Sequence, residues 1–471
     1  MKPNNSHGRK RQQQLAKDRQ VYYQRHIEGT PRETRREISF HEFRRLKRSG
    51  TPIPIIPLPE IIKFWASRKS QIGIHNEPWT KTRFLFIPRV FSLTDEQHQT
   101  ESFQFIYRLF DILYYGRAKT IHIDYVNCEQ IDVDASVCMD VLLEEFIRYF
   151  KARKRQLIQN EVEIIKPLNY NKDPILKVLF SIGGFSLING INLEFSDIIP
   201  LPLQVGCRLQ ELNWERRAKE VTIIMDYVEK CLKRTDHALT DKASEQLYVS
   251  IGEVLANADE HATTDYRYSI GYFQESQPNQ NMLGILQLTI MNFGDTIYEK
   301  FTDSDCPNQT VVKQMRDLSA KYTANGWFRK AVFEEEALWT LYALQQGVTS
   351  IPKKRGNGFI SLIDRFFGLK GDTLSDNMSQ MTIISGNTRI IFDGTHQIKT
   401  VSTLDKNGQL RDRKIMSFNT SGSLRDQPDK NCVKFVSEYF PGTLVSAKIC
   451  IKPGNTAIVE QFDKPTHETR N

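Results

Sequence analysis

The stretch SEQLYVSIGEVLANADEHAT, residues Ser244–Thr263, decides how we interpret the chain. Apolar residues recur in it at intervals of three and four positions, which predicts a helix with one buried face: Leu247, Ile251, Leu255 and Ala258. Polar residues three and four apart share the opposite face: Glu253, Asn257, Glu260 and His261. An ordinary amphipathic helix with a solvated polar face would give the same pattern, so the helix alone leaves its role open.

Glu253 and Asn257 lie one helical turn apart, and this pair suits magnesium-dependent chemistry. A side-chain amide oxygen can ligate Mg²⁺, a hard cation that takes few protein ligands and keeps several waters. A carboxylate one turn earlier can orient a water molecule or accept a proton. If the helix serves a magnesium–nucleotide site, further elements of that site should follow along the chain.

Two such segments follow in order. Leu286–Asp295 reads LQLTIMNFGD, an alternating strand that ends in a turn at Asn292 and Gly294. Arg355–Phe366 reads RGNGFISLIDRF, in which a G-x-G precedes a helical pattern. Together with the pattern E-x-x-x-N-A-x-x-H-A at residues 253–262, these segments resemble the boxes of the GHKL superfamily of ATPases and kinases, and are most similar to the anti-sigma-factor serine kinases.

The resemblance covers residues 210–452 and implies an ATP-binding domain with the Bergerat-type α/β sandwich. It implies that Asn257 is the Mg²⁺ ligand and that Glu253 is the catalytic carboxylate that activates the attacking group. Phosphoryl transfer depends mainly on such positioning and charge neutralisation. His261 has no ligand partner in the sequence, and we interpret it as a helix-end residue.

The first glycine segment departs from the family pattern. Asn292 stands where the family has an Asp that accepts a hydrogen bond from the adenine amino group. An amide oxygen can still accept that bond, without a full negative charge. Gly294 keeps the turn glycine, and the second glycine of the pattern is missing.

The second glycine segment keeps both glycines, Gly356 and Gly358. Glycine lets the backbone approach a phosphate closely, and the start of the following helix offers free N–H groups to an anion. Lys354 and Arg355 immediately precede the first glycine and are further candidate ATP-binding residues.

The middle region predicts a second α/β layer, because strand and helix patterns alternate from Ala118 to Gly183. Its order resembles the STAS domain of anti-sigma-factor antagonists, with Val133–Val137 in place of their I-D-S-S-G motif. Ser136 matches the phosphoacceptor of those antagonists, although Ala135 and Val137 depart from the motif. A plain helix start capped by Asp134 or Ser136 is the alternative.

These resemblances divide the chain into four parts: a basic arm and Pro-rich linker at 1–60, a STAS-like α/β domain at 61–205, a GHKL domain at 206–452 and a tail at 453–471. Three finer expectations concern the second domain. We expect a helix and a strand within Arg208–Leu232, a hairpin at Met381–Gly394, and a last strand, Gly442–Ile451, that completes the sheet.

Charge is concentrated in the arm. The chain of 471 residues carries a net charge of +8, and residues 1–50 hold 14 Lys and Arg against 5 Asp and Glu. Basic residues interleaved with Tyr and Phe suit nucleic acid, whereas a solvated or self-packed arm explains the composition equally. The seven scattered cysteines predict reduced thiols and a cytoplasmic protein, and no apolar run predicts a membrane helix.

The sequence thus predicts a magnesium-dependent ATP-binding regulatory protein that hydrolyses ATP or phosphorylates a protein, with a protein partner or a second copy of the chain as its counterpart. Two alternatives stay open. One is a non-catalytic module that senses nucleotide, and the other is a nucleic-acid-associated ATPase that uses residues 1–50.

Overall fold

The computed structural model of the chain describes twelve stretches and one single position. They are residues 58–73, 78, 80–116, 118–156, 165–184, 193–207, 213–261, 263–276, 283–323, 332–350, 358–369, 379–404 and 410–451. Most of the basic arm and the C-terminal tail, and also Lys354, Arg355 and Gly356, therefore lie outside the described residues. The fold is mixed α/β, with parallel and antiparallel sheets, which confirms the predicted class at this level.

The chain divides into two compact units, each built on a sheet of its own. Unit 1 comprises residues 1–89, 101–128 and 138–170, and unit 2 comprises 90–100, 129–137 and 171–471. Unit 2 therefore includes three segments from the region that the sequence assigned wholly to the first domain: 90–100, 129–137 and 171–205. The expected boundary after residue 205 falls inside strand β6 (Ile198–Cys207), which pairs with the sheet of unit 2.

Unit 1 is built on a three-stranded parallel sheet in the order β1-β3-β5. Its strands are β1 (Thr80–Phe86), β3 (Ala118–Asp124) and β5 (Ile165–Leu168). Its helices are α3 (Glu60–Ser67), α4 (Lys69–Ile72) and most of α5 (Gln99–Tyr115) and α6 (Val133–Gln156). Trp65, Phe110 and Phe146 pack ring against ring in its core.

Unit 2 is built on a five-stranded antiparallel sheet in the order β6-β7-β8-β12-β9. Besides β6, its strands are β7 (Tyr266–Ser276), β8 (Leu283–Phe293), β9 (Gln380–Phe392) and β12 (Val433–Ile451). β12 contains the expected last strand but begins earlier, and it lies between β8 and β9 rather than at an edge.

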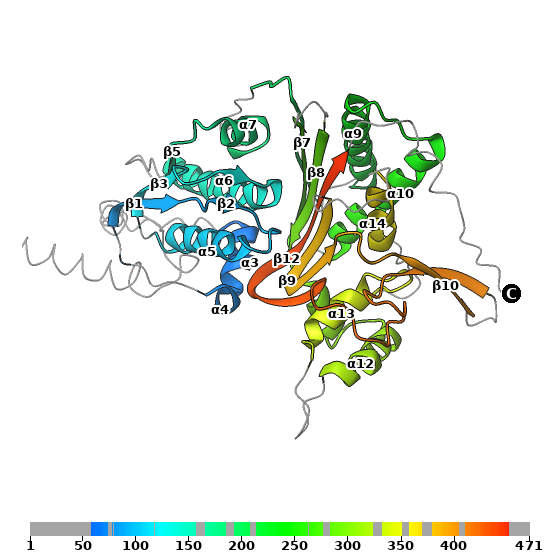
Figure 1. The fold of residues 1–471 in the computed structure, drawn as a ribbon. Coiled ribbons are helices and arrows are strands. Elements are labelled where there is room, and N and C mark those ends of the chain that lie inside the picture. Colours follow the sequence, from blue (N-terminus) through cyan, green and yellow to red (C-terminus); the bar gives the residue numbers. More distant parts are fainter. Residues whose placement is uncertain are drawn as a thin grey trace, which may run out of the picture. The chain divides into compact units, whose positions relative to one another are not determined.

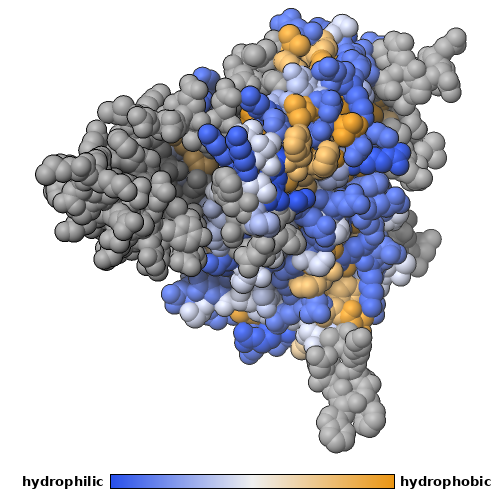
Figure 2. All heavy atoms as spheres, turned by 90° about the vertical axis from the view of Figure 1, so that its left-hand side faces the viewer, coloured by the Kyte–Doolittle hydropathy of each residue, from blue (hydrophilic) through white to orange (hydrophobic). Residues whose placement is uncertain are grey.

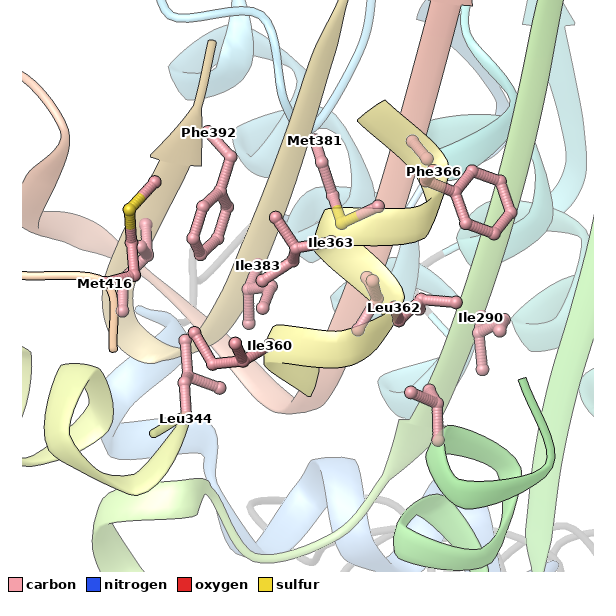
Figure 3. Close-up of a cluster of buried hydrophobic side chains, with 14 of the residues drawn as sticks. Ile290, Leu344, Ile360, Leu362, Ile363, Phe366, Met381, Ile383, Phe392 and Met416 are labelled. Carbon is pink, nitrogen blue, oxygen red and sulfur yellow. The ribbon is translucent and has the colours of Figure 1, made fainter. Parts of the chain in front are cut away.

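Three helices cover one face of this sheet: α9 (Asn213–Arg234), α10 (Asp241–His261) and α14 (Gly358–Gly368) (Figure 1). Alternate residues of each strand point into the shared core, as period-two side chains must. Figure 3 shows Ile363 of α14 beside Met381 and Ile383 of β9. The predicted helix Ser244–Thr263 is therefore confirmed, and it forms part of the layer that buries the sheet.

Unit 2 also contains further helices and two small strand pairs. The helices are α7 (Asp173–Ser181), α11 (Ile297–Thr302), α12 (Gln309–Thr323) and α13 (Glu335–Ala343). The strands β10 (Lys399–Leu404) and β11 (Leu410–Ile415) pair antiparallel, and β2 (Val90–Phe91) pairs parallel with β4 (Gln130–Ile131).

Two of the finer expectations were wrong. The segment expected to contain a helix and a strand is described from residue 213 on, and that part is one helix, α9. Its buried apolar residues recur at helical spacing: Val221, Ile224, Met225, Val228, Cys231 and Leu232. The expected hairpin is one continuous strand, β9, with a kink at Gly386.

The helix start predicted near Asp134 and Ser136 is also placed differently. α6 begins at Val133, so Asp134 and Ser136 lie inside its first turn rather than capping it.

Hydrophilic residues cover most of the described surface visible in Figure 2, and the hydrophobic residues there occur in small groups between them. Within the described residues, no helix combines the length and the apolar character needed to cross a bilayer. All seven cysteines lie in the described residues and are free thiols, as the sequence predicted.

Candidate functional site

Two adjoining hollows open where α10 and α14 approach β8 and β12. They share four lining residues: Asn257, Ile297, Phe359 and Thr443. Their volumes are about 70 Å³ and about 40 Å³. Asn257, which the sequence singled out as a magnesium ligand, therefore lies at the junction of the two hollows.

The smaller hollow is apolar except for two amides and the hydroxyl of Thr443. Val254 and Ala258 of α10 line it on one side. Residues of strands β8 and β12 line it on the other side: Ile290, Met291, Asn292 and Val445. A mostly apolar lining with a small number of polar groups is typical of small-molecule sites. We therefore call it the apolar hollow.

Asn292 is the amide that the strands bring to the apolar hollow, and only 3% of its surface is exposed. Its Nδ2 donates a hydrogen bond to the Ala258 carbonyl at 3.3 Å, which ties β8 to α10. No hydrogen bond to its amide oxygen is formed among the described residues. That oxygen is the atom that remains to accept a bond from a ligand donor.

The backbone behind Asn292 is unusually close to the neighbouring strand. Gly442 of β12 pairs with Phe293, and a Cβ atom at this glycine would lie 2.0 Å from the Asn292 carbonyl oxygen. Its φ of +148° is also one that other residues rarely adopt. The Gly294 N–H donates to the Pro441 carbonyl at 3.2 Å, so the predicted turn glycine is held against the same strand.

The larger hollow is more polar, and we call it the polar hollow. Its polar lining comes from the turn after β8 and from the segment after α13: Asp295, Thr296, Lys300, Thr349 and Ser350. Lys300 forms an ion pair with Asp295 at 2.8 Å. A capping box between Thr296 and Glu299 fixes the start of α11. Lys300 lies one turn into α11, so this helix places a positively charged side chain at the polar hollow.

The Asn257 side chain is half-buried and forms no hydrogen bond with any described residue. An amide at the junction of two hollows without an internal partner is available to a ligand. Glu253 is half-buried one turn earlier on α10 and is absent from the described residues that line either hollow. The structure thus brings Asn257 and Asn292 to one hollow, whereas Glu253 is not among the described residues that line it.

A buried ionic network holds the C-terminal half of α10 against β7. Arg267 is fully buried and contacts Asp259 of α10, and it donates to Glu220 of α9 at 2.6 Å. Arg217 reaches the same Asp259 carboxylate at 3.3 Å. The attraction within buried ion pairs offsets their desolvation only when their geometry is good. The network joins the part of α10 next to Asn257 to α9 and β7.

The other predicted residues are distributed differently. Gly358 begins α14, so the second glycine segment stands at a helix start, and Phe359 beside it lines both hollows. Lys354, Arg355 and Gly356 lie outside the described residues. Ser136, the possible phosphoacceptor, is 1% exposed, which closes its hydroxyl to a kinase in this conformation.

The sequence did not single out most of the lining residues, among them Lys300, Phe359 and Thr443. Phe359 directly follows Gly358 and could have been found from that spacing. Thr443 reaches the site only because β12 pairs with β8 opposite Asn292, a long-range register that leaves no local signal. Lys300 follows Asp295 by five positions in a segment with no counterpart in the three superfamily-like motifs.

Comparison of the chain with protein-family models, with curated proteins and with solved structures found no match.

Proposed function

We propose that the chain is a magnesium-dependent ATP-binding regulatory protein of the GHKL type that hydrolyses ATP or phosphorylates a protein. The observation that carries the proposal is the half-buried Asn257 amide, without a hydrogen-bond partner among the described residues, at the junction of an apolar and a polar hollow. The order of the three sequence segments that resemble that superfamily supports it independently.

In this proposal the two hollows have separate roles. The apolar hollow takes the base, whose amino group donates to the free oxygen of Asn292. The polar hollow takes the sugar and phosphates, with Lys300 exchanging Asp295 for a phosphate oxygen. The start of α14 at Gly358 offers backbone N–H groups to the same anion.

Magnesium would be held through the Asn257 amide oxygen, and the residues present fit a cation that takes few protein ligands. When bound, the ion neutralises the charge of the triphosphate. Sites for drug-sized ligands span roughly 300–1,000 Å³, and the hollows enclose about 70 and 40 Å³. ATP binding therefore requires their walls to move apart.

A second candidate function is a nucleotide-sensing module without turnover. The position of Glu253 favours it, because this carboxylate is not among the described residues that line the hollows. A general base has to come within hydrogen-bond reach of the group it activates, directly or through one water. In an enzyme, the wall movement that admits ATP would have to expose Glu253.

Turnover of radiolabelled ATP by the purified full chain separates the two candidates when free phosphate and phosphoprotein are resolved. For the enzyme, Glu253→Gln should bind ATP like the wild type and turn it over at least tenfold more slowly, since general-base catalysis typically contributes about 10²–10⁴-fold. Glu245→Gln changes an exposed carboxylate of the same helix and should leave the rate unchanged.

Each outcome has a distinct meaning. ATP binding without turnover, alone or with candidate partners, would favour the sensing module. Equal turnover by the wild type and Glu253→Gln would place the base elsewhere. Failure of the wild type to bind ATP at all would contradict both candidates.

A further inference from the structure

A second cluster of chemically capable side chains lies in unit 2, away from the two hollows. His396 follows β9, and Asp429 and Cys432 precede β12. One potential metal-ligand atom of each residue lies within 4.8 Å of the other two. Among the described residues, no other group of three His, Cys, Asp or Glu side chains comes this close. The Nε2 atom of His396 lies 3.3 Å from Oδ2 of Asp429.

The backbone holds the three residues from several directions. The Asp429 N–H donates to the Phe418 carbonyl at 2.6 Å, and the Asp429 carbonyl accepts from the Cys432 N–H at 3.1 Å. The Cys432 carbonyl accepts from the Ile391 N–H of β9 at 2.8 Å. The segment with Asp429 and Cys432 is therefore bound to the end of the strand that leads to His396.

Phe418 adds an independent sign of constraint. It is 1% exposed and has a φ of +54°, which is a rare conformation for a bulky residue. Its ring packs edge-on against the His396 imidazole, with centroids 5.7 Å apart. Backbone strain of this kind persists where the surroundings impose it, and it gathers at functional sites.

The compact arrangement argues against a nucleophilic triad. In a Cys–His–Asp triad the imidazole stands between the thiol and the carboxylate, so these two groups are separated by a ring and two hydrogen bonds. Here the carboxylate, imidazole and thiol atoms lie mutually close. Cys432 is also 3% exposed, which denies a substrate access to its sulfur. A single centre that all three atoms face suits this geometry better.

We propose that His396, Asp429 and Cys432 bind one Zn²⁺ ion. Imidazole nitrogen, carboxylate oxygen and thiolate sulfur are the three ligand types that zinc accepts, and a mixed set excludes Mg²⁺ and Ca²⁺, which prefer oxygen alone. Three protein ligands leave the fourth tetrahedral position to water. The ion would join the turn after β9 to the turn before β12. Since neither turn lines the hollows, the proposal is independent of nucleotide binding.

The nearby charges permit a cation at this place. Asp393 lies close enough to act electrostatically on Cys432, and its Oδ1 accepts from the Thr395 N–H at 2.9 Å. Lys434 also acts on Asp429 but is paired with Glu96. The local balance of carboxylates over free cations therefore favours a divalent ion.

The test uses the full chain purified without a metal-chelating tag. Its zinc content is measured by elemental analysis after dialysis, and Co²⁺ then replaces zinc as a spectroscopic probe. We expect one zinc per chain, and for cobalt a sulfur-to-metal charge-transfer band with the visible bands of a four-coordinate ion. Cys432→Ser should abolish the charge-transfer band, and His396→Gln should weaken zinc binding at least tenfold.

Two matched variants serve as controls. Cys306→Ser changes another buried thiol, and His237→Gln another partly buried imidazole, both in unit 2 and outside the cluster. Both controls should keep zinc and the cobalt spectrum. A wild-type cobalt spectrum without a sulfur band would overturn the proposal even if Cys432→Ser fails to fold. So would zinc binding that is equal in His396→Gln and His237→Gln.

Discussion

Two neutral amides, Asn257 and Asn292, define the candidate site at the scale of single residues. Asn257 has no hydrogen bond with the described residues, whereas Asn292 donates to the Ala258 carbonyl. The sequence identified both by resemblance. It did not reveal that the second amide also joins β8 to α10, because that contact depends on the packing of a helix on a strand.

This contact changes what the substitution Asn292→Asp is expected to do. The resemblance implies that a carboxylate would accept the adenine bond at least as well as the amide does. Without nucleotide, however, the carboxylate would face the Ala258 carbonyl, so that two acceptors meet in a buried place. We expect Asn292→Asp to lower the free energy of unfolding by about 1–3 kcal/mol and to keep or improve ATP affinity.

Chemical denaturation and calorimetry measure the two effects on Asn292→Asp separately. Gln427→Glu makes the same change at an exposed amide of unit 2 and should alter neither. Unchanged stability of Asn292→Asp would show that the contact with Ala258 contributes nothing. Loss of ATP binding beside a tightly binding wild type would show that the base is recognised by another route.

At the scale of elements, helical periodicity predicted α10 within three residues at its start and two at its end. The hairpin predicted across β9 failed for a local reason. Ser385-Gly386-Asn387 has turn composition, but the positive φ of Gly386 only kinks the strand, and Glu336 accepts the Asn387 N–H at 2.7 Å. Glu336 comes from α13, so the residue that stabilises the kink is invisible in the local sequence.

Another element-scale feature is the first turn of α6, where Asp134 is 1% exposed. It accepts hydrogen bonds from the Leu93 N–H at 2.9 Å, the Thr94 hydroxyl at 2.6 Å and the Ser446 hydroxyl at 3.1 Å. Burial and the nearby Asp132 raise the pKa of Asp134 from 3.8 to about 6. The segment 129–137 is thus fixed to β12 by a carboxyl group whose pKa lies above its usual value.

The raised pKa predicts how stability depends on pH. The folded state binds the proton more tightly than the unfolded state, so the free energy of unfolding falls as pH rises from about 4 to about 6. The loss amounts to about 3 kcal/mol and is complete above that range. Asp134→Asn keeps an acceptor for Leu93 and cannot ionise, so its stability should not show this fall.

Chemical denaturation at pH 4, 5, 6 and 7 tests this prediction. The free energy of unfolding is measured at each pH for Asp134→Asn and for the wild type, and the two pH profiles are compared. Asp226→Asn removes an exposed carboxylate of α9 and serves as the control, with a profile like that of the wild type. Parallel profiles of Asp134→Asn and the wild type would show that Asp134 does not titrate in this range.

At the scale of the whole molecule, the order of strand and helix patterns predicted a mixed α/β fold but not its division. Unit 2 takes in residues 90–100 and 129–137 through long-range contacts, such as the hydrogen bond from the Ser446 hydroxyl of β12 to the Asp134 carboxylate at 3.1 Å. A domain boundary drawn along the sequence cannot represent such a division. The charge distribution, by contrast, is a property of the sequence alone.

Residues 1–50 carry the surplus positive charge and contribute no residue to the candidate site as the described residues define it. Deleting them should therefore leave a folded protein with unchanged ATP affinity. If the arm binds nucleic acid, the deletion should also abolish a salt-dependent affinity for DNA or RNA. Calorimetry and filter binding at several salt concentrations measure the two properties. A soluble truncation that no longer binds ATP would show that the arm is part of the nucleotide-binding fold.

The central claim is that nucleotide binds at Asn257, and calorimetry of ATP binding with and without Mg²⁺ tests it most directly. The matched variants are Asn257→Ala and Gln246→Ala, which removes another partly buried amide of α10 outside both hollows. We predict that the wild type and Gln246→Ala bind ATP more tightly with Mg²⁺ than without it, and that Asn257→Ala loses this dependence on magnesium. Equal magnesium-dependent ATP affinity in Asn257→Ala and the wild type would contradict the claim.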